Sequence, residues 1–189
     1  MAVLKLYHTG YDVIRRPDLT AGRKNADFGQ GFYLSTETEF SVRWARQRRG
    51  MTTWLNTYEL DPEGLLVKRF DRDKDWFSCI FANRSGAPDP LAGFDLVLGP
   101  IAADTLYDTW GVITSGILQA DQALRLMQIG PVYTQAAVKT EKAVSALRFL
   151  EAREMSPEEI AGYRETVRSE ESRFQEDFAK LFLEMTDGI

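Results

Sequence analysis

Short apolar runs and polar loops follow one another through the first 150 residues of the chain. Runs rich in β-branched, leucine and aromatic residues predict buried strands at 2–8, 31–35, 53–60, 64–70, 94–98 and 133–140. Longer segments predict helices at 36–49, 73–83, 104–115, 121–127 and 142–152. These strands and helices do not alternate regularly, so the pattern favours an α+β fold over a doubly wound parallel sheet.

Turn and cap residues mark several boundaries. Asp61-Pro62-Glu63-Gly64 is a strong turn signal and joins the strands at 53–60 and 64–70. Thr36 and Glu39 have the spacing of a capping box, so the helix at 36–49 should begin there and stop at Gly50.

The last 36 residues predict one long amphipathic helix. Ser156-Pro157-Glu158-Glu159 is a helix start with a capping serine, and an apolar stripe follows at Ile160, Tyr163, Val167, Phe174, Phe178, Leu181 and Met185. Docking of this stripe on the chain's own domain is favoured over a partner-binding or dimerising helix. We therefore divide the chain into a domain at 1–153 and a C-terminal helix at 154–189.

Composition removes several classes of function. The chain has one histidine, His8, and one cysteine, Cys79, which excludes intrachain disulfides, cysteine clusters and multi-histidine metal sites. We expect no metal. No apolar run approaches the roughly 20 residues that span a bilayer, and no signal peptide is recognisable, so a cytoplasmic setting is expected.

Charge is unevenly distributed along the chain. The net charge is −5, and the segment from Glu151 onward holds eleven acidic and five basic residues. This argues against broad attraction to nucleic acid. A basic cluster at Arg43, Arg46, Arg48 and Arg49 favours a solvated helix face, with a phosphate or nucleic-acid contact as the alternative.

The most informative motif is Gly29-Gln30-Gly31-Phe32-Tyr33. It is not a dinucleotide-binding fingerprint, because its glycines precede a strand instead of following one. Together with Tyr7-His8-Thr9-Gly10, with Ser41 and Trp44 at fixed spacings after the tyrosine, and with a late strand at Tyr133–Val138, it resembles the ADP-ribosyltransferase superfamily. The resemblance is to the branch of diphtheria toxin and the poly(ADP-ribose) polymerases and spans about residues 3–150.

A closer likeness is to small bacterial domains of unassigned function in that superfamily. It is carried by the segments Gly22–Gly29, Asp95–Asp104 and Lys139–Ala143. Members of this group often sit beside small partner genes, as in toxin–antitoxin pairs. The resemblance therefore implies a split β-sheet core with flanking helices, NAD as co-substrate, a protein or nucleic-acid acceptor, and a possible antitoxin as partner.

The resemblance also implies roles for individual residues. His8 would bind the adenosine-side ribose of NAD, backbone groups near Thr9 and Gly10 would hold the nicotinamide amide, and Ser41 would bond the same amide. Tyr33 and Trp44 would face opposite sides of the nicotinamide ring. Core packing is the alternative for the aromatic residues and for His8. Gly31 belongs to the same motif, and Arg23 and Lys24 would meet the pyrophosphate unless they belong to a solvated loop.

Gln135 is the main departure from the family pattern. Family members with glutamate at this place hold the 2′-hydroxyl of the nicotinamide ribose, whereas glutamine keeps hydrogen-bonding capacity without charge. Glu141 is a conceivable substitute carboxylate, although a capping role suits it better. The expected function is mono-ADP-ribosylation of a macromolecule, with Gln135, Tyr33 and His8 as catalytic residues. The alternative is a catalytically degenerate NAD-binding or interaction module.

Overall fold

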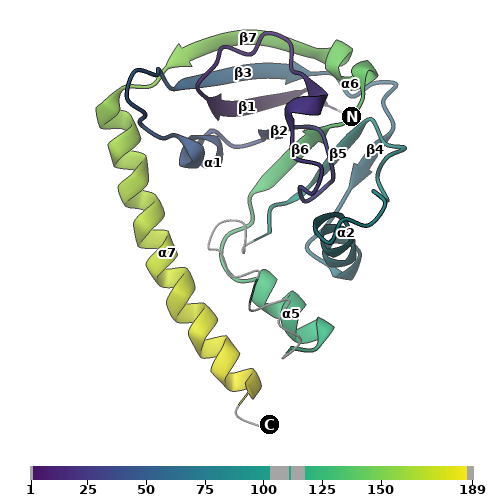
Figure 1. Cartoon of the computed structure of the whole chain (residues 1–189), viewed down its shortest axis with the longest axis vertical. Helices are drawn as coiled ribbons and strands as arrows, with labels where there is room; N and C mark the ends of the chain where they lie inside the picture. The colour runs from purple at the N-terminus through teal and green to yellow at the C-terminus, as the bar shows by residue number, and fades with distance from the viewer. Residues whose placement is uncertain (1, 103–110, 112–117, 187–189) are drawn as a thin grey trace.

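A computed structural model describes residues 2–102, 111 and 118–186 (Figure 1). The protein is α+β, as predicted, with a mixed seven-stranded sheet in the order β4-β5-β6-β2-β1-β3-β7. The strands are β1 Leu4–Gly10, β2 Phe32–Ser35, β3 Trp54–Leu60, β4 Val67–Arg69, β5 Leu96–Pro100, β6 Thr134–Val138 and β7 Leu147–Glu154. The α-helices are α1 Thr38–Ser41, α2 Lys74–Arg84, α5 Ala120–Met127, α6 Glu141–Ala146 and α7 Pro157–Thr186, with short 3-10 turns η1 Leu19–Ala21 and η2 Val42–Trp44.

The sheet consists of two parts that meet at β1 and β2. These two strands share a single registered pair, Tyr7 with Ser35, whereas β1 and β3 pair over seven residues. Figure 1 shows β7, β3 and β1 lying together in one direction, while β6, β5 and β4 run in another. Among the strand pairs of the described residues, only β4 and β5 run parallel. Residues of both strands line a cavity at this junction.

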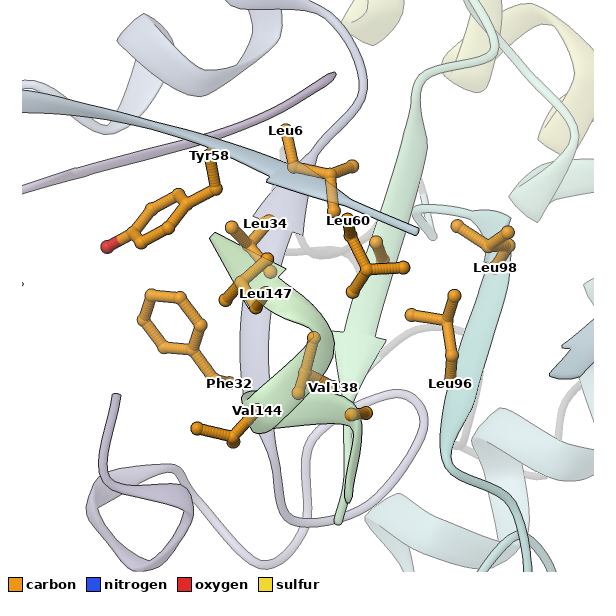
Figure 2. Packing of buried hydrophobic residues seen from close by; sticks show 12 residues of the cluster. Leu6, Phe32, Leu34, Tyr58, Leu60, Leu96, Leu98, Val138, Val144 and Leu147 are labelled. Carbon is orange, nitrogen blue, oxygen red and sulfur yellow. The ribbon is translucent and has the colours of Figure 1, made fainter. Parts of the chain in front are cut away.

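Successive side chains along the central strands point to opposite faces of the sheet, and each face carries an apolar layer. One layer spans both parts of the sheet; Figure 2 shows its members from six strands and α6: Leu6, Phe32, Leu34, Tyr58, Leu60, Leu96, Leu98, Val138, Val144 and Leu147. On the other face, Val97 and Ala137 pack against Trp76 and Ile80 of α2 and Leu124 of α5. Gln135, two residues before Ala137, therefore projects from this second face of β6.

The turn at 61–64 does not join a pair of neighbouring strands. Gly64 adopts a φ of 74°, as a tight turn favours, but β3 pairs with β1 and β7 while β4 pairs with β5 at the opposite edge. The turn signal was therefore correct, and the strands on its two sides do not pair with each other.

The helix predicted at 36–49 is much shorter in the structure. The Thr36 hydroxyl contacts the carbonyl of Thr134 and caps no helix, and α1 passes into η2 and ends at Trp44. The Arg46 guanidinium donates to the carbonyls of Arg43 and Ala45, which a continuing helix would have used as acceptors. These side-chain bonds replace the next helical turn.

The helix predicted at 142–152 is also wrong beyond its first turns. Thr140 caps α6 through the Ala143 amide, and the chain becomes strand β7 from Leu147. Residues 147–154 pair with the whole of β3 and place Phe149 edge-on against Tyr58. Ladder bonds and packing override the helix propensity of this segment. The helix predicted at 104–115 lies, apart from residue 111, outside the described residues.

The long C-terminal helix forms as predicted and contacts the rest of the chain at separate points. Ile160 and Tyr163 pack with Val42 and Leu55, and Phe174 packs with Ile129. The Arg43–Glu170 ion pair joins η2 to α7, and Figure 1 shows α7 running from the end of β7 to α5. Ile160, Tyr163 and Phe174 of the stripe therefore contact the chain's own domain. Among the described residues, no helix has both the length and the apolar character needed to cross a bilayer.

Candidate functional site

A cavity of about 300 Å³ opens where the two parts of the sheet meet. Its wall comes from β1, β2, the loop before β2, the α1–η2 segment, the residue after β5 and the start of β6. The lining residues are Tyr7, His8, Thr9, Arg23, Ala26, Asp27, Tyr33, Leu34, Ser35, Phe40, Ser41, Trp44, Ile101 and Gln135. The structure therefore brings together seven of the residues singled out from the sequence: His8, Thr9, Arg23, Tyr33, Ser41, Trp44 and Gln135.

His8 is a half-buried, neutral hydrogen-bonding group. Its Nδ1 lies 2.9 Å from the carbonyl oxygen of Tyr33. A carbonyl only accepts, so Nδ1 carries the proton and Nε2 is left as an acceptor. Burial lowers the pKa of His8, and the bond to Tyr33 opposes that shift only in part. At neutral pH, His8 can accept a hydrogen bond from a ligand hydroxyl through Nε2.

Tyr33 holds its ring in place through its hydroxyl. The hydroxyl accepts from the Phe28 amide at 2.9 Å and donates to the Gly29 carbonyl at 2.7 Å. Burial, and secondarily the Asp27 carboxylate, raises the pKa of Tyr33 far above its usual value. The phenol therefore stays protonated, and Tyr33 offers the cavity an aromatic surface and no base.

Thr9, Ser41 and Trp44 form another part of the wall. The Thr9 and Ser41 hydroxyl oxygens lie 3.1 Å apart, and Ser41 is buried. Trp44 is 43% exposed, although its ring packs in a T-shaped arrangement with that of Phe40, with the ring centroids 6.1 Å apart. No ring contact joins Tyr33 and Trp44 among the aromatic pairs of the described chain. Both residues therefore line the cavity without packing on each other.

Gln135 is paired with an acid that sequence reasoning missed. Its Nε2 donates to Asp27 Oδ2 at 2.8 Å and to the Pro100 carbonyl at 3.3 Å. Asp27 is 6% exposed, and its Oδ1 accepts from Arg84 Nε at 3.0 Å and from Nη2 at 2.5 Å. Asp27 belongs to the segment 22–29, one of those that carry the likeness to small bacterial domains, and it directly precedes Phe28, which is fully buried. Its place in that segment, next to an apolar residue, is the sequence signal that could have pointed to it.

Four residues singled out from the sequence lie outside the cavity wall. A Cβ at Gly31 would lie 2.6 Å from the carbonyl oxygen of Val138, so this glycine permits close approach of β2 and β6. Gly10 ends β1, where an added Cβ would lie 3.4 Å from His8 Nε2, and Lys24 is an exposed loop residue. Glu141 lies in the first turn of α6 and pairs with Arg16 at 2.6 Å. It does not line the cavity, so it cannot replace the missing glutamate there. Arg23 is exposed but does line the cavity.

The basic cluster is not one solvated face, contrary to the prediction. Arg43 is 7% exposed, pairs with Glu170 and lies over the Tyr133 ring at 5.4 Å. Arg48 and Arg49 follow η2 and are exposed. Across the described ranges, no group of three or more histidine, cysteine or acidic side chains is placed to hold a metal.

Comparisons with known proteins place the chain by family and leave its activity open. Residues 4–149 match a family model described as "Protein of unknown function (DUF3990)". The matched segment contains all of the cavity wall and ends before α7 begins. No curated protein and no solved structure matches the chain.

Proposed function

The chain belongs to the DUF3990 family of proteins of unknown function, and from its cavity we propose that it binds NAD and transfers ADP-ribose to a macromolecular acceptor. The observation that carries the proposal is the convergence of His8, Tyr33 and Gln135 on one wall. These residues lie 25 and 102 positions apart in the sequence, in the order and on the strands that the superfamily resemblance implies.

The residues of the cavity suit the nicotinamide riboside half of NAD. A volume of about 300 Å³ is at the small end for ligand pockets, so the adenosine half would extend over the open mouth. Tyr33 and Trp44 supply aromatic surfaces, which attract a cationic pyridinium ring. Thr9 and Ser41 supply hydroxyls for the carboxamide, and Arg23 at the mouth supplies a cation for the pyrophosphate.

The proposed reaction balances without any further reactant. The bond between ribose C1′ and the nicotinamide nitrogen breaks, and its electron pair neutralises the pyridinium, which leaves as nicotinamide. A nucleophilic atom of the acceptor bonds to C1′ and releases its proton to water. Holding NAD in one pose lowers the barrier by orienting C1′ toward the acceptor.

The test measures binding and turnover separately. Full-length protein is titrated with NAD by calorimetry and then incubated with labelled NAD and total cell extract. We expect NAD binding, nicotinamide release and label on a discrete macromolecular band. His8→Ala should lose the label, and Phe81→Ala, which changes an exposed aromatic outside the cavity, should keep it. Absence of NAD binding by the folded wild type would overturn the proposal.

A non-catalytic NAD-binding module is the second candidate. The absence of a glutamate at residue 135 favours it, because Gln135 has no charge to stabilise a cationic transition state. This candidate predicts NAD binding by calorimetry with no nicotinamide release under any acceptor condition.

A further inference from the structure

Asp27 and Gln135 form a carboxylate–amide pair in the wall of the cavity. We propose that this pair takes the role that a single glutamate has in the superfamily pattern. Gln135 Oε1 accepts a hydrogen bond from the 2′-hydroxyl of the ribose, and the Asp27 carboxylate, which is bonded to the same amide, supplies the negative charge. The inference rests on the proposed function, since it names the groups that stabilise the reacting ribose of NAD. In this arrangement Asp27 acts through Gln135 and is a positioning residue.

The orientation of the Gln135 amide follows from its neighbours. Asp27 Oδ2 at 2.8 Å and the Pro100 carbonyl at 3.3 Å are both acceptors, so the amide nitrogen must face them. Both N–H groups are then used. Oε1 forms no hydrogen bond with the residues that the structure describes, and Gln135 lines the cavity. The oxygen is therefore the atom of Gln135 that can accept from a ligand.

The charge of Asp27 is held close to this amide. Arg84 bonds to Oδ1 through Nε and Nη2, and this ion pair compensates the burial of the carboxylate. The second oxygen, Oδ2, remains for Gln135. An amide that donates to an anion is polarised, and its carbonyl oxygen becomes a stronger acceptor. Gln135 Oε1 thus carries more negative charge than an unpaired glutamine would.

The step in which this matters is departure of nicotinamide. As the C1′–N bond breaks, its electron pair leaves with nicotinamide and positive charge develops on C1′ and the ring oxygen of the ribose. The 2′-hydroxyl donates a hydrogen bond to Gln135 Oε1, and no proton moves onto the amide. The proton that the acceptor loses passes to water, so the pair stabilises charge without acting as a base.

This arrangement makes a prediction about Gln135→Glu, the substitution that would restore the glutamate of the superfamily pattern. Gln135→Glu would place two carboxylates at the 2.8 Å separation now bridged by a hydrogen bond. Like charges so close cannot both ionise, so the variant would hold a proton or push the groups apart. Gln135→Glu should therefore impair the site, and it should work only together with Asp27→Asn, which returns one amide and one carboxylate.

The experiment compares four full-length proteins with the wild type: Asp27→Asn, Gln135→Glu, the double variant, and Asp89→Asn. The last is the matched control, because Asp89 pairs with Lys139 beside the same loop but lies outside the cavity wall. NAD affinity is measured by calorimetry, nicotinamide release in single turnovers, and folding by thermal melting at several pH values.

We expect Asp27→Asn and Gln135→Glu each to release nicotinamide about a hundredfold more slowly than the wild type, with NAD affinity changed by only about threefold. The double variant should recover to within about tenfold of the wild-type rate, and Asp89→Asn should match the wild type. The melting temperature of Gln135→Glu should fall relative to that of the wild type as the pH rises through the carboxylate range. A purely structural pair would lose affinity and stability together and would not show this separation.

The outcomes separate the two proposals. A wild type that neither binds nor cleaves NAD overturns the proposed function and this inference with it. A wild type that cleaves NAD while Asp27→Asn cleaves it equally fast, or while Gln135→Glu is faster than the wild type, overturns the inference alone. If Asp27→Asn fails to fold, the double variant decides, because a folded double variant without recovered rate contradicts the pair.

Discussion

At the scale of single residues, His8 and Tyr33 each use one part of the side chain for hydrogen bonds within the protein. His8 uses Nδ1 on the Tyr33 carbonyl, and Tyr33 uses its hydroxyl on the loop at 28–29. Each leaves one chemically distinct surface for a ligand, Nε2 in His8 and the ring in Tyr33. Trp44 differs because it is 43% exposed, so its substitution separates binding from folding.

Trp44→Ala should weaken NAD binding about fivefold, the equivalent of about 1 kcal/mol of stacking. Calorimetry measures the affinity, and an unchanged melting temperature shows that the fold is intact. Phe81→Ala removes a comparably exposed aromatic ring, 45% exposed and outside the cavity, and should leave affinity unchanged. Equal affinities of the wild type and Trp44→Ala would remove Trp44 from the binding surface.

The lowered pKa of His8 makes stability depend on pH. Because the folded protein binds the proton less tightly than the unfolded chain, the free energy of unfolding falls as the pH drops below the ordinary value of 6.5, down to the folded pKa. The slope from this one group is at most about 1.4 kcal/mol per pH unit. Urea unfolding from about pH 7.5 to about pH 5 should therefore show a larger loss for the wild type than for His8→Asn. Parallel curves would contradict a depressed pKa.

At the scale of elements, the contact between β2 and β6 sets the position of both Tyr33 and Gln135. These strands pair over four residues, with Ser35 opposite Gln135. Gly31 directly precedes β2, at a point where a side chain would meet the β6 backbone at Val138. This glycine therefore serves strand packing, whereas the motif in which it occurs would have suggested a ligand contact.

Gly31→Ala should lower the free energy of unfolding by about 1–3 kcal/mol, because a Cβ 2.6 Å from the Val138 carbonyl forces the strands apart. Gly93→Ala is the control, since no atom lies within 4 Å of its added Cβ. That variant should be neutral or slightly more stable. Denaturant unfolding measures both, and equal stabilities of the two variants would show that β2 can shift without cost.

At the scale of the whole molecule, α7 ties distant parts of the chain together. It contacts Val42 and Leu55 through Ile160, Arg43 of η2 through Glu170, and Ile129, two residues after α5, through Phe174. The Arg43 side of the ion pair is buried, at 7% exposure, so its loss should matter more than that of a surface pair.

Glu170→Gln should therefore lower the free energy of unfolding by about 1–3 kcal/mol, since Arg43 would keep its burial without its carboxylate. Glu59→Gln breaks the exposed pair with Arg148, whose side chains are 40% and 66% exposed, and should cost no more than about 0.5 kcal/mol. Urea unfolding compares the two. Similar small losses would mean that apolar contacts alone hold α7 in place.

The sequence by itself determined the features that depend on neighbours within a few residues. Periodicity located β1, β2, β3, α2 and α7, and the serine at 156 caps α7 through the Glu159 amide as its spacing indicated. The resemblance carried by the order and spacing of the motifs also singled out seven of the residues that line the cavity.

The tertiary structure alone decided what depends on partners far along the chain. Residues 147–154 are strand because they form ladder hydrogen bonds with β3, and the chain leaves the helix after η2 because the Arg46 side chain bonds to the Arg43 and Ala45 carbonyls. Asp27 became part of the cavity because Arg84 and Gln135, 57 and 108 positions away, both bond to its carboxylate. A local pattern contains no information about such bonds, whereas burial makes each of them energetically decisive.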